Sequence, residues 1–336
     1  MNELIDLLNP RILFQKLKQK DKNIESFKRI YHRVIKRLLF RRIYFERNND
    51  IKKSIIIAGG GRSGTTWLAE VLAEYFHYRL IFEPLHPNIH YFKPIHDTRY
   101  IPPSSSHLNY KDKLYKLFSG ELKHQKLDLD NRIFRPKGRI VKFIRANLLI
   151  PWMKTQFPNI PIVFILRHPC AVISSRINLG WEVETFNHYL GNKDLMEHYL
   201  NPYKDIITNA ESPVQKQACN WCIENLVPLK AMKNKKWIIT TYEDLVMSFK
   251  NEIKRIIQQI SPKTSINENA IINYRSFQTP NKSKSLEPLE LLSVWKSRLT
   301  SHEINDILTI VKKFSLDNVY DNHPFSKKYS HHSSKV

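Results

Sequence analysis

The sequence predicts an α/β fold, in which helices flank a central, mostly parallel sheet. Five short runs are apolar almost throughout, at residues 54–58, 79–82, 139–144, 162–166 and 237–240. Strands that a parallel sheet buries on both faces have this continuous apolar pattern, whereas half-exposed strands alternate. Helical spacing of apolar residues is found at residues 65–76, 169–178, 243–260 and 301–314. Strands that alternate with helices in this order indicate the crossover units of a parallel sheet.

Composition and pattern divide the chain into one main domain with a segment at each end. The chain has 336 residues, of which 42% are hydrophobic, so it can bury a full core. We assign residues 51–320 to the domain, 1–50 to a basic helical segment and 321–336 to a polar, disordered tail. Two inserts, 84–138 and 178–216, lack a clear period. We expect them to form an acceptor site above the carboxyl ends of the strands.

A strong excess of positive charge indicates an anionic partner. Lys and Arg number 54 against 31 Asp and Glu, which gives a formal net charge of +23. Phosphorylated small molecules, acidic polymers, nucleic acid and membrane surfaces all fit this charge. Residues 24–45 place apolar side chains at helical spacing with Lys and Arg opposite. Such a helix can lie on an anionic membrane surface or pack on the domain, and the sequence leaves both open.

The remaining composition favours a cytoplasmic protein that is at most peripheral on a membrane. No apolar run approaches the ~20 residues that span a bilayer, and the N-terminus lacks a secretory pattern. The three cysteines do not describe a disulfide framework. Cys219 and Cys222 are spaced as C-x-x-C, but a helical pattern surrounds them. We expect them to be half-buried helix residues rather than metal ligands.

A glycine-rich loop follows the first strand and has the frame of a phosphate-binding loop. Residues 58–67 read AGGGRSGTTW, and four of the eight glycines of the chain lie here. Backbone N–H groups of such a turn, at the positive end of a helix, suit a phosphate. The usual lysine is replaced by Thr65, but Arg62 supplies a cation within the loop. Ser63 and Thr66 add hydroxyl donors.

A second anion site is predicted where a neighbouring strand ends. In nucleotide-hydrolysing enzymes with this kind of loop, a buried strand ends in an Asp that holds magnesium. Here the strand at 162–166 is followed by Arg167, which repels a metal and attracts an anion. Arg62 and Arg167 therefore imply a ligand with two phosphate-like groups and no obligatory metal. Glu243 and Asp244, after another strand, leave a divergent ATP-binding enzyme open.

At these residues the sequence resembles the sulfotransferases that use 3′-phosphoadenosine 5′-phosphosulfate (PAPS), of the bacterial and carbohydrate type. The resemblance implies the P-loop-like α/β fold of that family and PAPS as co-substrate, with no metal. It also implies that the 5′-phosphosulfate is bound by the loop of Gly61, Arg62, Ser63, Gly64, Thr65, Thr66 and Trp67, with Trp67 near the adenine. Arg167 and Ser175, eight residues apart, would bind the 3′-phosphate, and Tyr242 would contact the nucleotide. Lys282 and Lys284 are candidates for a loop that closes over the 3′-phosphate.

Three residues are candidates for the transfer step. Sugar-acting members of the family use a glutamate about twenty residues beyond the loop, and Glu83 occupies that place. It would take the acceptor proton, with His86 as the next candidate, although a structural ion pair would also explain a glutamate there. Lys142, near the end of a strand, would lie beside the leaving phosphate. Arg62 would neutralise charge on the phosphosulfate bridge.

The sequence thus favours an enzyme that transfers a sulfuryl group from PAPS to a hydroxyl or amine. A carbohydrate or glycolipid acceptor is favoured, and a small-molecule acceptor remains open. A P-loop kinase is an alternative within the enzymes. A basic nucleic-acid-binding protein is an alternative from another class, but no nucleic-acid-binding motif is present, so we expect no nucleic-acid partner.

Overall fold

The structure is a computed structural model, and it describes residues 43–46, 48–183, 185–232, 236–263, 265–271 and 287–329. Most of the predicted basic helix at 24–45 lies outside these residues. The candidate lysines Lys282 and Lys284 also lie outside them.

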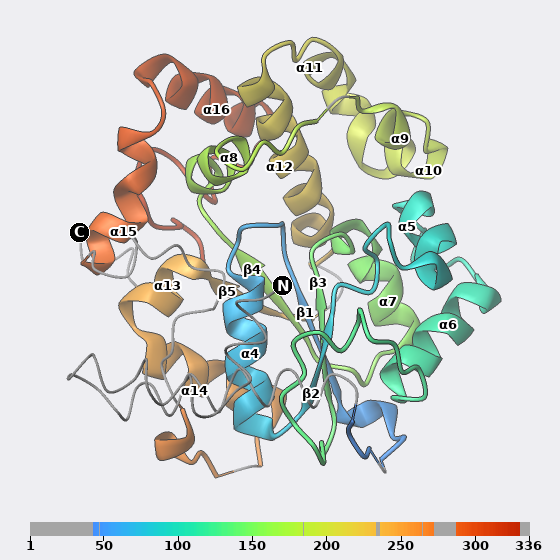
Figure 1. Ribbon diagram of the computed structural model, residues 1–336. Helices are drawn as coiled ribbons and strands as arrows, with labels where there is room; N and C mark the ends of the chain where they lie inside the picture. Colours follow the sequence, from blue (N-terminus) through green and yellow to red (C-terminus); the bar gives the residue numbers. More distant parts are fainter. Residues whose placement is uncertain are drawn as a thin grey trace, which may run out of the picture.

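All five predicted strands are present and form one parallel sheet in the order β2-β3-β1-β4-β5 (Figure 1). The strands are β1 (Ser54–Ala58), β2 (Arg79–Phe82), β3 (Arg139–Phe143), β4 (Ile162–Leu166) and β5 (Ile238–Thr241). The central strands β1, β3 and β4 are buried along their whole length. This burial on both faces is the reason for their continuous apolar sequence.

Each face of the sheet is covered by helices. Side chains of β1 alternate between two cores, since Ile55 and Ile57 pack on one face and Ile56 and Ala58 on the other. The first face packs against α4 (Thr65–Phe76), α13 (Tyr242–Met247) and α14 (Phe249–Ile260). The second packs against α7 (Ile150–Gln156), α8 (Pro169–Ile177), α12 (Pro213–Ala231) and α16 (Ser301–Lys313). The predicted α/β class is confirmed.

One predicted helix is wrong in its continuity. The apolar spacing at 243–260 predicts a single helix, but the structure has α13 and α14 with a break at Ser248. Ser248 has φ −135° and ψ 50°, outside the helical region. The apolar period of the sequence continues through Ser248, so the sequence did not indicate the break.

Both inserts contain short helices, and they contact each other. Residues 84–138 include α5 (Lys93–Thr98) and α6 (Leu108–Phe118). Residues 178–216 include α9 (Asn187–Leu190), α10 (Lys193–Leu195), a π-helical turn (Met196–Leu200) and α11 (Lys204–Thr208). The hydroxyl of Tyr100 lies 2.8 Å from Nδ1 of His198, and the amide of Asn192 donates to the Tyr100 carbonyl at 3.3 Å. The inserts therefore touch each other, and in Figure 1 α9 and α10 of the second lie above α5 of the first.

The packed chain extends beyond both boundaries assigned from the sequence. After α15 (Pro288–Ser293) and α16, the chain continues to Tyr329, and Phe325 and Ser326 are buried. At the other end, Tyr44 and Glu46 lie against the amino ends of the strands. Within the described part of the chain, no helix combines the length and apolar character needed to cross a membrane.

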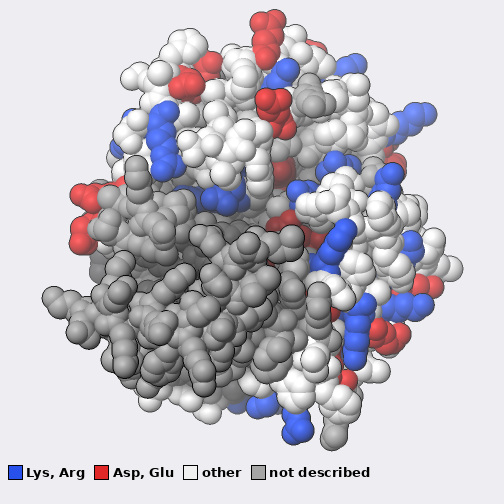
Figure 2. All heavy atoms as spheres, viewed as in Figure 1, with Lys and Arg blue, Asp and Glu red and all other residues white. Residues whose placement is uncertain are grey.

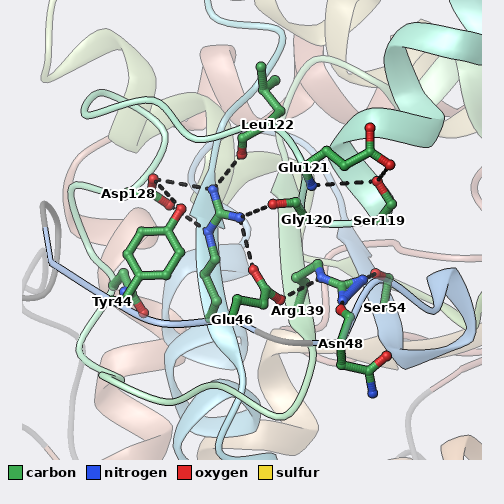
Figure 3. A network of polar contacts seen from close by, with 12 residues as sticks. Tyr44, Glu46, Asn48, Ser54, Ser119, Gly120, Glu121, Leu122, Asp128 and Arg139 are labelled. Carbon is green, nitrogen blue, oxygen red and sulfur yellow. Dashed lines mark hydrogen bonds and ion pairs between the residues drawn. The ribbon is translucent and has the colours of Figure 1, made fainter.

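A buried ionic network anchors the segment 43–50 (Figure 3). Arg79 and Arg139 are the first residues of neighbouring strands, and both are fully buried. The carboxylate of Glu46 bridges them, at 3.1 Å from Arg79 and 2.7 Å from Arg139. Asp128 pairs with Arg79 at 2.7 Å and accepts a hydrogen bond from Tyr44. Arg139 also donates to the carbonyls of Phe118 and Asn48. The network closes the amino edge of the sheet.

Candidate active site

The glycine-rich loop between β1 and α4 packs closely against two other segments. A Cβ at Gly59 would lie 2.5 Å from the carbonyl oxygen of Ile165, on the neighbouring strand. A Cβ at Gly64 would lie 2.6 Å from the ring of Tyr242, and Gly64 has φ +92°. Glycine is therefore required at both positions. No side chain caps the first turn of α4, which begins at Thr65, so its N–H groups can bind an anion.

Two arginines predicted to bind separate phosphates lie in contact. Arg62, with φ +76°, donates from Nε to the hydroxyl of Ser175 at 3.0 Å. Arg167 donates to the carbonyl oxygen of Arg62 at 2.8 Å. Burial lowers the pKa of Arg62, and the charges of Arg167 and Arg176 lower it further. A bound anion would relieve this crowding of positive charge.

Aromatic side chains cover one side of this arginine cluster. Tyr242 begins α13, and the guanidinium carbon of Arg167 lies 4.0 Å from its ring centre. Trp67 meets Tyr242 edge to face at 5.9 Å and stacks on Phe249 at 5.4 Å. Among the described residues, the indole Nε1 of Trp67 is buried without a hydrogen-bond partner, and so is Nε of Arg167. These two donors could bind a polar ligand.

Glu83 lies between two cations at the ends of β2 and β3. One carboxylate oxygen is 2.6 Å from Nζ of Lys142, and the other is 2.9 Å from Arg145. Burial raises the pKa of Glu83, but the charges and hydrogen bonds of these cations outweigh it and hold the pKa below its usual value. Burial lowers the pKa of Lys142, whose ammonium also lies 3.7 Å from the ring centre of Phe82. Glu83 is therefore held as an ionised carboxylate with a cation on each oxygen.

His86 is the other candidate base. Its backbone N–H donates to the Glu83 carbonyl at 3.0 Å, so it lies one turn beyond Glu83. Burial and the charge of Arg145 lower the pKa of its imidazole. It is neutral at pH 7, but no contact of its ring with the arginine cluster is found among the described residues.

The topology explains why these residues meet. The loop follows β1, Glu83 follows β2, Lys142 is near the end of β3, Arg167 follows β4 and Tyr242 follows β5. In a parallel sheet all carboxyl ends lie at one edge, which is where ligands of α/β proteins bind. β1 lies in the middle, with β3 and β2 on one side and β4 and β5 on the other. The arginine cluster and Glu83 therefore flank the loop.

A family model described as "Sulfotransferase family" matches residues 54–261, which is more than half of the chain. The chain belongs to the sulfotransferase family. The matched range begins with β1 and ends after α14, so it includes the loop, Glu83, Lys142, Arg167 and Tyr242. It leaves out α15, α16 and the C-terminal residues.

Similar solved structures are sulfotransferase domains. One is titled "Sulfotransferase Domain from the Curacin Biosynthetic Pathway", at 14% identity and TM-score 0.39, covering 78% of this chain and 97% of that one. Another is the "Sulfotransferase Domain from the Synechococcus PCC 7002 Olefin Synthase", at 15% identity and TM-score 0.42, covering 80% and 96%. No curated protein matches the sequence significantly.

The sulfotransferase also contains site residues that sequence reasoning missed. Arg176 donates to the carbonyl of Gly61 at 3.2 Å and pairs with Glu224 of α12 at 2.7 Å. Arg176 therefore links the loop to α12, which packs on the face of the sheet opposite to α4. The sequence does contain one indication of this pair. Glu224 lies within the largely apolar pattern of α12, and a charge on a buried helix face needs a partner of opposite charge.

Trp181 lies over the loop of the sulfotransferase. A Cβ at Gly61 would lie 2.6 Å from the indole ring, and the side chain of Ile144 is also close. The Trp181 backbone is fixed at both ends, since its N–H donates to Arg176 at 3.0 Å and its carbonyl accepts from Gln217 at 2.6 Å. The side chain nevertheless remains 39% exposed. An exposed indole between the loop and the end of β3 can contact a substrate.

Other residues discussed from the sequence lie in buried positions of the fold. Ser63, Thr65 and Thr66 are buried in the loop and the first turn of α4. Cys219 and Cys222 are free thiols in α12, as their helical pattern predicted, but both are fully buried rather than half-buried. Within the described ranges, no cluster of three or more His, Cys, Asp or Glu could hold a metal.

Proposed function

We propose that this sulfotransferase transfers the sulfuryl group of PAPS to a hydroxyl or amine of a carbohydrate or glycolipid acceptor. The contact between Arg62, Ser175 and Arg167 carries the proposal, because it concentrates two guanidinium groups at one edge of the sheet. An adenosine carrying a phosphosulfate and a second phosphate supplies the two anionic groups that such a cluster requires. Family membership supports the sulfuryl chemistry.

On the donor side, the residues present fit the co-substrate. The loop from Gly61 to Thr66 and the first turn of α4 would bind the 5′-phosphosulfate through N–H groups and Arg62. Arg167 and Ser175 would bind the 3′-phosphate. The unpartnered donors on Arg167 and Trp67, with the ring of Tyr242, would face the nucleoside. Arginine supplies the cations, so the proposal includes no metal.

On the acceptor side, Glu83 would act as the base. The transfer forms a bond between sulfur and the acceptor oxygen or nitrogen and breaks the bond between sulfur and the bridging oxygen of the phosphosulfate. The acceptor proton moves to Glu83, whose carboxylate is kept ionised by Lys142 and Arg145. Lys142 and Arg62 would stabilise the negative charge left on the phosphate.

The two inserts would form the acceptor pocket. They carry several aromatic side chains, among them Trp181, and aromatic rings stack well on sugar faces. A small-molecule acceptor fits the same walls. We further propose a cytoplasmic location, in which residues 24–45 can contact an anionic membrane surface.

The alternatives receive less support. A P-loop kinase would need a magnesium site, whereas Arg167 stands at the end of β4. On the face shown in Figure 2, the described Lys and Arg side chains are scattered among acidic ones rather than joined in one stripe. A continuous basic surface is what nucleic-acid binding would favour.

Calorimetry with adenosine 3′,5′-bisphosphate, in the presence of a chelator, tests the donor site. We expect binding without metal and at least a tenfold loss of affinity in Arg62→Ala and in Arg167→Ala. Arg135→Ala removes an exposed arginine outside the site and is the matched control. Binding of ATP with magnesium, and none of the bisphosphate, would instead support a kinase.

A further inference from the structure

A buried carboxylate that the transfer does not use lies directly behind Arg167. Glu243 is the second residue of α13, and it is 1% exposed. One of its oxygens accepts the backbone N–H of His168 at 2.9 Å. The other accepts the hydroxyl of Tyr320 at 2.8 Å. Because His168 follows Arg167 in the chain, Glu243 fixes the turn from which the Arg167 side chain extends.

The C-terminal part of the chain holds the other side of this turn. The His168 ring stacks on Trp295 at 4.6 Å, and its Nε2 lies 2.8 Å from the carbonyl oxygen of Asp321. Its Nδ1 accepts the N–H of Cys170, so the ring proton is on Nε2 and is donated to Asp321. Trp295, Tyr320 and Asp321 all lie beyond the part of the chain that the family model matches.

The charges around Glu243 are few. Among the described residues, Arg167 is a cation that favours the ionised form of Glu243, in addition to the hydrogen bonds that it accepts. His168 is neutral, since burial lowers the pKa of its imidazole to about 4, and burial keeps the Tyr320 hydroxyl protonated. Asp244 is adjacent in sequence, and Asp321 and Lys296 act on His168. Burial opposes the ionisation of Glu243 and raises its pKa to about 7, although its hydrogen bonds and Arg167 act the other way.

A phosphate bound at Arg167 changes this balance. The dianion cancels the positive charge that stabilises the Glu243 carboxylate and adds a negative charge on the same side. The protonated carboxyl group fits the site without movement, because the Tyr320 oxygen can accept a hydrogen bond as well as donate one.

We propose that Glu243 is a positioning residue for Arg167, and that it takes up a proton from solvent when the nucleotide phosphate binds there. This inference rests on the proposed function, since it assumes that Arg167 binds the nucleotide. It links the C-terminal residues, through Tyr320 and His168, to affinity for the nucleotide. The affinity for the nucleotide is then highest at a pH below the pKa that Glu243 has in the free protein. It falls as the pH rises from that pKa to the higher pKa that Glu243 has in the complex.

Proton uptake on binding is directly measurable. The full chain is titrated with adenosine 3′,5′-bisphosphate at pH 7 in two buffers of different protonation enthalpy. With a Glu243 pKa of about 7, we expect uptake of up to about half a proton by this group in the wild type. Glu243→Gln should lose the proton uptake that is due to Glu243. Protons taken up or released by the ligand are the same for both proteins, so they cancel when the variant is compared with the wild type. From pH 6.5 to 8.5 we expect affinity to fall roughly tenfold in the wild type and less in Glu243→Gln.

Glu252→Gln is the matched control. Glu252 is a buried carboxylate of α14 that accepts from Thr240 at 2.6 Å and pairs with Arg255, and it lies outside the donor site. Its variant should keep the wild-type proton uptake. Equal uptake in the wild type and Glu243→Gln would overturn the inference.

Tyr320→Phe is a second test, which is useful if Glu243→Gln does not fold. It removes a hydrogen bond that stabilises the ionised carboxylate, so the fall in affinity should move to higher pH. If the affinity of Tyr320→Phe falls over the same pH range as that of the wild type, the inference is also overturned. If the wild type does not bind the bisphosphate at all, the proposed function is itself wrong. If it binds without uptake through Glu243, only the inference fails.

Discussion

Glu83 is held by Lys142 and Arg145, one on each carboxylate oxygen, and these contacts set its behaviour with pH. The charges and hydrogen bonds of these two cations hold the pKa of Glu83 below that of a free glutamate, so the carboxylate is ionised at neutral pH. The ion pairs therefore stabilise the fold above the pKa of an unfolded glutamate, about 4.3, and are lost only as the pH falls through the lower folded pKa.

Glu83→Gln should remove turnover while leaving the donor site intact. An amide cannot accept the acceptor proton, so we expect kcat to fall by about 10²- to 10⁴-fold with unchanged affinity for the bisphosphate. In the wild type, Glu83 should cause no loss of activity from pH 8 down to pH 5. Sulfate transfer from labelled PAPS measures both. Turnover in Glu83→Gln equal to that of the wild type would assign Glu83 to a structural role.

Gly61 and Trp181 should show coupled effects. Gly61→Ala places a methyl group where the Trp181 ring lies, at 2.6 Å, so the indole must move. We expect Gly61→Ala to weaken activity, and Trp181→Ala to reduce the further loss, because the methyl group then has space. A double-mutant cycle on kcat/KM gives the coupling. Additive losses would mean that the ring does not determine the effect. Gly59→Ala, which meets the backbone of Ile165, should not be rescued in this way.

At the scale of elements, the sequence predicted the strands well because burial on both faces leaves a continuous apolar run. The sequence did not predict the partners of buried charged residues. Arg79 and Arg139 begin two strands, and nothing local indicates that Glu46, 33 and 93 residues away, neutralises both. Arg176 and Glu224 are 48 residues apart and were missed for the same reason. Pairing across the fold depends on topology, which sequence spacing does not contain.

The segment before β1 should be required for stability. Removing the Glu46 carboxylate leaves two fully buried guanidinium groups with fewer partners, so we expect Glu46→Ala to cost about 3–5 kcal/mol of unfolding free energy. Asp112→Ala, an exposed carboxylate of α6, should change it by less than about 0.5 kcal/mol. Denaturant unfolding compares the two. Similar values would show that the network is of little energetic importance.

At the scale of the whole molecule, the described residues on both sides of the assigned domain, before residue 51 and after residue 320, contribute to the packed domain. The sequence assigned residues 321–336 to a tail because they are polar, but composition does not register a single buried Phe325 or the backbone carbonyl of Asp321. The carboxyl edge of the sheet was predictable as the candidate site because four motifs each follow a strand and Lys142 lies near the end of β3. The contact between Arg62 and Ser175 was not, since it depends on the position of β1 beside β4.

Truncation tests the C-terminal contribution. A chain that ends at residue 320 loses the buried Phe325 and the carbonyl that accepts from His168, and we expect its melting temperature to fall by several degrees. A chain that ends at residue 329 keeps every described contact and is the control. Equal melting temperatures of the two chains would show that residues 321–329 add no stability.

The strand order β2-β3-β1-β4-β5 has a consequence for how such an enzyme can change. The proposed nucleotide contacts follow β1, β4 and β5, whereas Glu83 and the longer insert follow β2 on the opposite half of the sheet. Selection for a new acceptor can therefore remodel the insert that follows β2 while the nucleotide contacts proposed after β1, β4 and β5 keep their sequence. The same division offers protein engineers a boundary: exchange of parts of residues 84–138 that keeps Asp128, the partner of Arg79, should alter acceptor choice and leave the arginines proposed to bind the donor unchanged.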